Sequence, residues 1–164
     1  MLQALIAFFE DSGLADNIRE SEYLFPLIES VHVLVICLVV GSILAVDLRL
    51  LGVAYTDQPV SRVTKSILPL TWCAFSVALA SGGLLFISNA TKYLANGYFD
   101  TKMLLIGAAG LNMALFHLMG AKDLPRESAA IPPPAARLAG GLSIMLWIAV
   151  VACGRWIGFT MKML

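Results

Sequence analysis

Long apolar stretches separated by short polar connections dominate this chain. Four of them are long enough to cross a hydrocarbon core of about 30 Å, which takes roughly 20 residues of helix. They lie at residues 23–46, 67–89, 101–121 and 138–160. Because the connections are short, the pattern predicts an all-α integral membrane protein, a four-helix bundle with up-down-up-down topology. Residues 1–164 then form a single transmembrane domain.

Two segments outside these stretches carry further local information. Met1–Phe9 is apolar and too short to span, and its apolar positions follow helical spacing. It is followed by acidic residues rather than by a cleavage site, so we expect a short interfacial helix there. Ile131–Pro134 holds three consecutive prolines and predicts an extended linker before the last span.

Composition supports a membrane location. The chain is 59% hydrophobic and 13% charged, with a mean hydropathy of +0.84 and a formal net charge of zero. These values predict the lipid bilayer as a partner and give no reason to expect nucleic-acid binding. Lysine and arginine number six in the first and third connections and five on the other side, which favours an outside, periplasmic position for both termini.

The two histidines, His32 and His117, both lie within predicted spans. An imidazole in hydrocarbon needs a partner for each ring nitrogen. A polar side chain on a neighbouring helix, a proton pathway, a metal ion or a haem iron would each meet that need. Histidine placement is therefore the main indication of function.

Small residues lie near the histidines in depth and in helical phase. Gly107, Gly110, Ala114 and His117 share one face of the third span. Counted from the predicted span ends, Gly82 and Gly110 come at about the depth of His32. Such faces either let helices pack closely or leave room for a flat cofactor, and we predict Gly82 and Gly110 as clearance for a porphyrin ring.

Two charged residues are candidates to support a cofactor. Glu29 lies three residues before His32 on the same helix face, where it could orient the imidazole, pair with Arg155 or join a metal site. A di-iron site would need a second Glu-x-x-His motif from another subunit. Arg155 falls near the outer surface and could contact haem propionates.

The leading prediction is a b-type cytochrome with His32 and His117 as axial ligands of haem b, relaying electrons to or from a quinol or a redox protein. The two spans run in the same direction and His117 lies about 10 Å deeper, which argues against a shared iron. Each histidine could instead hold its own haem, or His32 could pair with its copy in a homo-oligomer.

Two alternatives remain open. One is a haem-free transport or accessory subunit with a buried network of Glu29, His32 and Arg155. The other is a copper-handling protein that uses His117 with Cys73 or Met145.

Segments along nearly the whole chain resemble an uncharacterised family of small bacterial four-helix membrane proteins. The segments that carry the resemblance are residues 25–32, 47–52, 102–105, 112–117 and 154–159. It implies a helical bundle in the bacterial inner membrane and no particular activity. The architecture is also similar to that of four-helix b-type cytochromes of bacterial membranes, many of which hold two haems with four histidines where this chain has two.

Overall fold

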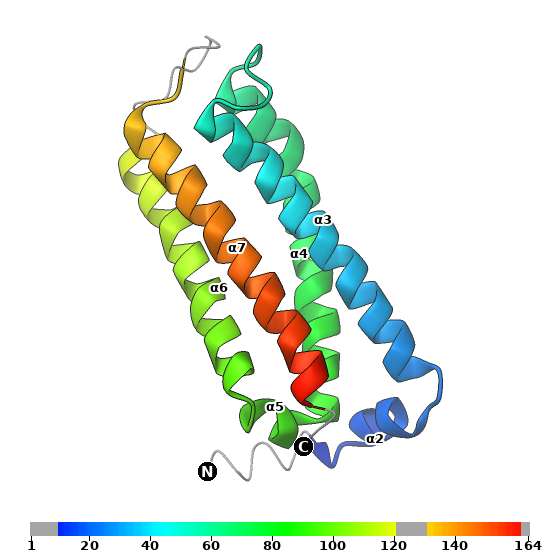
Figure 1. The fold of residues 1–164 in the computed structure, drawn as a ribbon. Coiled ribbons are helices and arrows are strands. Elements are labelled where there is room, and N and C mark those ends of the chain that lie inside the picture. Colours follow the sequence, from blue (N-terminus) through cyan, green and yellow to red (C-terminus); the bar gives the residue numbers. More distant parts are fainter. Residues whose placement is uncertain (1–9, 121–130, 162–164) are drawn as a thin grey trace.

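Four long helices form the bundle in the computed structural model, which describes residues 10–120 and 131–161. They are α3 (Leu24–Leu51), α4 (Val60–Ser88), α6 (Gly97–Leu115) and α7 (Pro134–Thr160), and they run alternately up and down (Figure 1). α6 continues into a π-helical turn, η1 (Phe116–Gly120). All four are long and apolar enough to cross a membrane. The all-α bundle and the multi-pass membrane character predicted from the sequence are therefore confirmed. The interfacial helix predicted at residues 1–9 lies outside the described residues.

The helices pack as a series rather than as a closed square. α3 lies against both α4 and α7, and α7 also lies against α6, whereas α4 and α6 share little backbone contact. We call the end of the bundle where α3 and α6 begin the α5 end, after the short helix α5 (Ala90–Leu94) that lies there (Figure 1). Residues on α3, α4, α6 and α7 can meet in the interior near this end.

All four helices extend further than the hydropathy pattern predicted, α6 by its earlier start at Gly97. α4 begins at Val60, seven residues before the predicted start, and Pro69 lies inside the helix. α7 begins at Pro134, because a proline at the first helical position sacrifices no intrahelical hydrogen bond. Only the first part of the predicted extended linker is therefore non-helical. α3 continues to Leu51, and Gly52 ends it in the left-handed conformation with φ of 76°.

The extension of α3 buries two charged residues that a pattern-based reading would leave at the interface. Asp47 is 5% exposed and Arg49 1% exposed. The Arg49 guanidinium donates to the Gln58 carbonyl at 2.7 Å, and Asp47 hydrogen-bonds to Ser143 of α7. These bonds compensate in part for the lost hydration and so allow α3 to run on through both residues.

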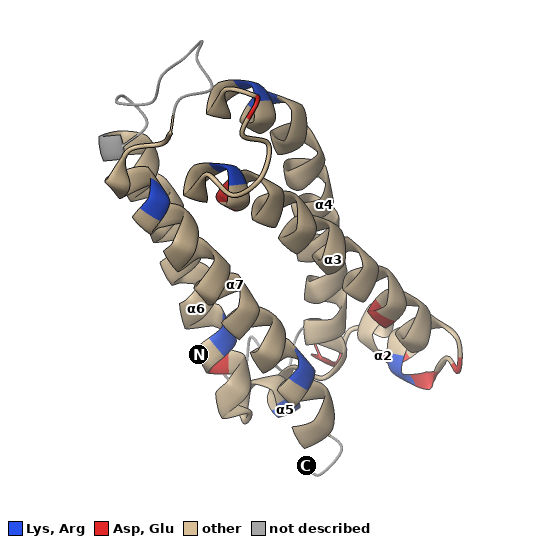
Figure 2. Cartoon of the chain, turned by 45° about the horizontal axis from the view of Figure 1, so that its top comes forward, with Lys and Arg blue, Asp and Glu red and all other residues tan. Residues whose placement is uncertain are grey.

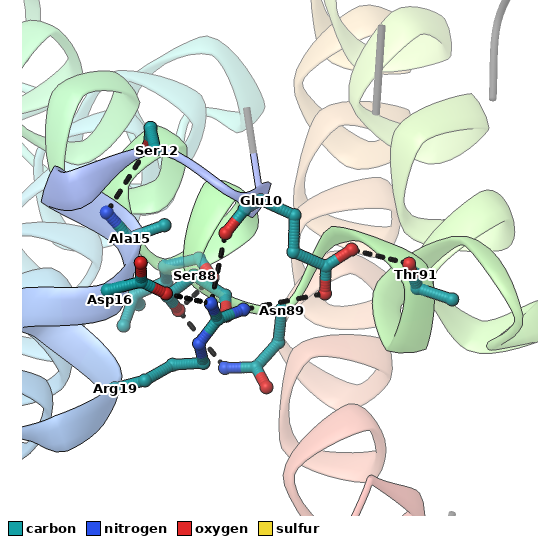
Figure 3. Close-up of polar contacts among 9 residues, drawn as sticks. Glu10, Ser12, Ala15, Asp16, Arg19, Ser88, Asn89 and Thr91 are labelled. Carbon is teal, nitrogen blue, oxygen red and sulfur yellow. Dashed lines mark hydrogen bonds and ion pairs between the residues drawn. The ribbon is translucent and has the colours of Figure 1, made fainter. Parts of the chain in front are cut away.

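The short helix α2 (Gly13–Glu20) packs under α3 and α4 at the α5 end. Its apolar residues Ala15 and Ile18 are buried. Arg19 donates to the Ser88 carbonyl at 3.3 Å, and its guanidinium also contacts Asp16 and the backbone of Glu10 (Figure 3). This arginine therefore joins α2 to the C-terminal end of α4.

Charged residues gather toward the two ends of the bundle (Figure 2). This distribution agrees with four spans whose middle sections face lipid. A charged side chain that lies further inside is an exception and identifies a place to examine for function.

Candidate ligand site around His32

His32 projects from α3 toward α4 and is half-buried. Its Nδ1 lies 2.9 Å from the Ser81 hydroxyl oxygen. That hydroxyl is also 2.7 Å from the Val77 carbonyl oxygen, which can only accept, so Ser81 donates its one proton there. In the neutral ring, Nδ1 of His32 must then carry the proton and donate to Ser81. A ring nitrogen of His32 also hydrogen-bonds to the Ala78 backbone, and in this tautomer Nε2 carries the lone pair.

This protonation pattern is the one that histidine ligands of metals use. One ring nitrogen is held by a hydrogen bond as N–H, and the other presents its lone pair to the metal. Glu29 was one candidate for this orienting role, alongside pairing with Arg155 or a place in a metal site, whereas in the structure Ser81 contacts Nδ1. A serine beside two glycines, at the depth of a histidine on another span, is the sequence signal that points to Ser81.

Gly82 lies directly beneath the imidazole. A Cβ atom added to Gly82 would come within 2.9 Å of Cε1 and 3.5 Å of Nδ1 of His32. The absence of a side chain is therefore what lets the ring reach Ser81. The sequence analysis predicted Gly82 as clearance for a cofactor, and here the space is filled by His32 itself.

Lys102 is a charged residue that the sequence analysis did not select. It lies on α6, half-buried, and a Cβ added to Gly154 of α7 would be 3.8 Å from its Nζ. Its ammonium group acts electrostatically on the His32 imidazole. α6 begins at Gly97 with Asn96 as its N-cap, and the Asn96 side chain accepts from the Tyr98 amide at 3.0 Å. This cap places Lys102 inside the helix, whereas the predicted start at residue 101 placed it at the membrane surface.

The residues of this site share one level of the bundle. A rise of 1.5 Å per residue places His32 about 12 Å and Lys102 about 8 Å from the start of their helices. Gly82 and Gly154 both lie about 9 Å from the end of theirs. We call His32, Ser81, Gly82, Lys102 and Gly154 the His32 cluster.

Aromatic rings close the α5 end below the His32 cluster. Phe86 of α4 stacks on Phe99 of α6 at 5.5 Å between ring centroids, and Tyr93 of α5 lies 5.5 Å from Phe99. Burial, and then the nearby Glu29 carboxylate, raise the pKa of the Tyr93 hydroxyl above its usual range. The three rings thus pack together nearer to the end of the bundle than the cluster.

Glu29 and Arg155 take positions that differ from their predicted ones. Glu29 is exposed and acts electrostatically on Tyr93. Arg155 is exposed as well, and its guanidinium lies over the Phe159 ring at 4.4 Å from the centroid, one turn along the same helix. Among the described residues, neither forms an ion pair with the other. The cation at the level of His32 is Lys102.

His117 lies far from His32. It is exposed on η1, and its Nδ1 donates to the Met113 carbonyl at 2.8 Å, which leaves Nε2 free. Helix rise places it about 30 Å from the start of α6, roughly 18 Å deeper than His32. The separation is larger than predicted because α6 begins earlier. The structure therefore does not bring the two histidines together.

The earlier start of α6 also moves Gly110. It lies about 20 Å from the start of the helix, roughly 8 Å deeper than His32. A Cβ added to Gly107 or Gly110 would meet nothing within 4 Å. Around the axis of α6, Gly107 and Gly110 both lie within about 80° of Phe99. They are therefore on the side of the helix where Phe99 contacts α4. The small-residue face thus borders the loosely packed α4–α6 side and lies deeper relative to His32 than predicted from the sequence.

Residues that could support the copper alternative are dispersed. Cys73 lies on α4 and Met145 on α7, and both are exposed. Within residues 10–120 and 131–161, no three His, Cys, Asp or Glu side chains come close enough to hold a metal ion. A preformed polydentate site is therefore absent from this part of the chain.

Comparison with known proteins yields one match. The profile of a family of unknown function, DUF6644, matches residues 23–160, which include all four spans. No curated protein and no solved structure matches the chain.

Proposed function

We propose that this chain, which belongs to the DUF6644 family of unknown function, is a membrane-embedded haem b protein that relays electrons. The observation that carries the proposal is the hydrogen bond from His32 Nδ1 to Ser81, which leaves Nε2 as a ligand. A haem bound there would supply one-electron oxidation and reduction.

The side chains of the His32 cluster fit such a group. Ser81 fixes the ring orientation and the tautomer of His32, and Gly82 admits the imidazole. Lys102 brings a positive charge to the same level. An oriented imidazole with a cation at the same level of the bundle is a donor set suited to an iron porphyrin, whose carboxylates are negatively charged.

His32 rather than a pair of histidines is the core of the proposal. The axial offset of roughly 18 Å favours separate roles for His32 and His117 over one shared iron. His117 presents a free Nε2 beside a small-residue face, so a haem count above one per chain would assign it a haem of its own.

The proposal includes a location and partners. The resemblance to small bacterial membrane proteins suggests the bacterial inner membrane, and the excess of lysine and arginine at the end opposite α5 favours the α5 end on the periplasmic side. A quinol or a redox protein would exchange electrons with the haem, and a homo-oligomer would cover some of the apolar surface.

The visible absorption spectrum of the purified protein tests the proposal. After haem-replete expression in a mild detergent, dithionite should produce a reduced b-type spectrum, and a pyridine haemochrome assay should give the haem count. His32→Ala should lose this haem, whereas His117→Ala, the matched control, should keep it. A haem-containing protein whose spectrum is unchanged in His32→Ala would overturn the assignment.

A haem-free accessory or transport subunit is the second candidate. The observation that favours it is the electrostatic coupling of polar groups near the α5 end, namely His32 with Lys102 and Tyr93 with the exposed Glu29. Lys102 replaces Arg155 in the network that the sequence analysis described. A colourless protein that remains folded would support this candidate, and metal analysis of the same sample would detect copper.

A further inference from the structure

Asp47 carries a buried carboxyl group that the proposed function does not use. The residue is 5% exposed, and its Oδ2 atom is fully buried without a hydrogen-bond partner. No other buried side-chain oxygen or nitrogen in the described part of the chain lacks a partner. An ionised carboxylate in this position would lose its hydration without full compensation.

The carboxyl group lies at the packed interface between α3 and α7. A Cβ atom added to Gly140 of α7 would lie 3.0 Å from the backbone oxygen of Asp47 and 3.6 Å from its Cα, so the two backbones are in contact there. Leu50 of α3 and Ala136 of α7 are buried in one apolar cluster beside this contact. Among these neighbours, only the hydroxyl of Ser143 hydrogen-bonds to the carboxyl group.

No charged group of the surrounding elements forms an ion pair with Asp47 in the part of the chain that the structure describes. Arg49 lies two residues along α3, on a different face of the helix, and donates to the Gln58 carbonyl. The other charged or titratable groups at this end are exposed, namely Tyr55 and Asp57 of the α3–α4 connection, Arg62 and Lys65 of α4, His117 of η1 and Arg137 of α7.

A proton is the ligand that this geometry suits. It needs a single oxygen atom, and it converts the buried anion into a neutral carboxyl group, which costs far less to bury. A calcium or magnesium ion would take at least about six oxygen ligands. α3 ends at Leu51, about 6 Å along the helix from Asp47, so the carboxyl group can exchange its proton with water at this end of the bundle.

We propose that Asp47 is a proton-binding site of the folded protein. Oδ2 carries the proton while α3 packs on Gly140. Release of the proton to water breaks the O–H bond, and the carboxylate that remains inside the interface weakens the contact between α3 and α7. The site lies about 22 Å along α3 from His32, so it operates with or without a ligand at His32.

Infrared spectroscopy of the purified protein in detergent tests for the proton. A protonated carboxyl group has a carbonyl stretch that a carboxylate lacks. At about pH 5.5, where an exposed aspartate is ionised, the wild type should show this band, and the band should disappear as the pH rises. Asp47→Asn should lack the band. Asp57→Asn, the matched control in the exposed connection, should keep it.

Unfolding by sodium dodecyl sulfate in mixed micelles at stepped pH measures the coupling to helix packing. The carboxyl group of the unfolded chain ionises at about pH 4, so above that pH the folded protein holds one more proton until Asp47 releases it. Over this interval the unfolding equilibrium constant should rise by up to about tenfold per pH unit and then level off. Asp47→Asn should remove this rise, because its amide stays neutral.

Three results would overturn the proposal. One is a wild-type spectrum without a band that Asp47→Asn removes, and another is an Asp47→Asn variant whose stability keeps the wild-type dependence on pH. The third is a wild-type protein that lacks the band and is stabilised by sodium chloride but not by choline chloride, which would assign a cation to Oδ2. If Asp47→Asn does not fold, wild-type protein with carbon-13 in its aspartate carboxyl groups replaces it, and the band should move to lower frequency.

Discussion

Replacing Gly82 by alanine tests the close approach of the His32 imidazole to α4. The new Cβ would lie 2.9 Å from Cε1 of His32 and 3.5 Å from Nδ1. Ordinary carbon–carbon contact begins at about 3.5 Å, so the ring has to move by roughly 0.5 Å or more. That movement stretches the 2.9 Å hydrogen bond to Ser81 beyond its normal range.

The expected cost follows from these two effects. Loss of the hydrogen bond contributes about 0.5–1.5 kcal/mol, and forcing the His32 side chain off its rotamer contributes about the same. Gly82→Ala should therefore lower the free energy of unfolding by about 1–3 kcal/mol relative to a control that gains only the helix propensity of alanine. Gly83→Ala is that control, since a Cβ there would meet nothing within 4 Å.

Unfolding by sodium dodecyl sulfate in mixed micelles, followed by circular dichroism, measures the difference between the two variants. Nitrogen-15 spectra of the histidine ring report the tautomer of His32 in the same samples. Equal stability of Gly82→Ala and Gly83→Ala, with the Nδ1–H signal unchanged, would refute the packing of His32 on Gly82.

Other predictions concern the same bundle. Gly140→Ala should destabilise the α3–α7 contact by about 1–3 kcal/mol in that unfolding assay, because its Cβ would lie 3.0 Å from a backbone oxygen of α3, whereas Gly141→Ala meets only a flexible side chain at 3.8 Å. Ser81→Ala should lower the free energy of unfolding by about 0.5–1.5 kcal/mol and shift the nitrogen signals of the imidazole. Ser76→Ala should do neither, because the Ser76 hydroxyl donates only to a carbonyl of its own helix. Burial raises the pKa of Tyr93, so the unfolded chain releases this proton first, and stability should fall as the pH rises through the ordinary tyrosine pKa of about 10. Tyr93→Phe should reduce this alkaline loss in pH-dependent unfolding, and an unchanged slope would contradict the burial of the hydroxyl.

Hydropathy alone located the four spans but misjudged where each of them begins or ends. The predicted ends stopped at charged residues, before Asp47 in the first span and after Arg137 in the last. In the structure, Asp47 finds a hydrogen bond on α7, and Pro134 serves as the first residue of its helix. Hydropathy averaged over a sequence window reflects only the polarity of the residues. It carries no information on whether a residue of another helix hydrogen-bonds to a polar side chain.

Prediction of the candidate site was limited in the same way, by contacts between helices that the sequence does not reveal. Sequence position identified His32 and the level of Gly82, because depth follows from the count of residues along a helix. Lys102 and Ser81 were missed, since their relevance depends on how α6 and α4 rotate about their axes and on the start of α6 at Gly97. His117 is a histidine like His32 but lies at another depth. Residue type alone therefore does not show that the two histidines belong to one site.

The bond between Arg19 and the Ser88 carbonyl has a consequence for the order of membrane insertion. The two residues are 69 positions apart in the chain, and Ser88 is the last residue of α4. During synthesis, α2 therefore leaves the ribosome long before its acceptor exists. Because the carbonyls at a helix C-terminus have no partners within the helix, the end of α4 offers Arg19 an acceptor only once α4 has formed. Docking of α2 thus marks completion of the first helical hairpin, and until then this amphipathic segment has only the membrane surface on which to rest its apolar face.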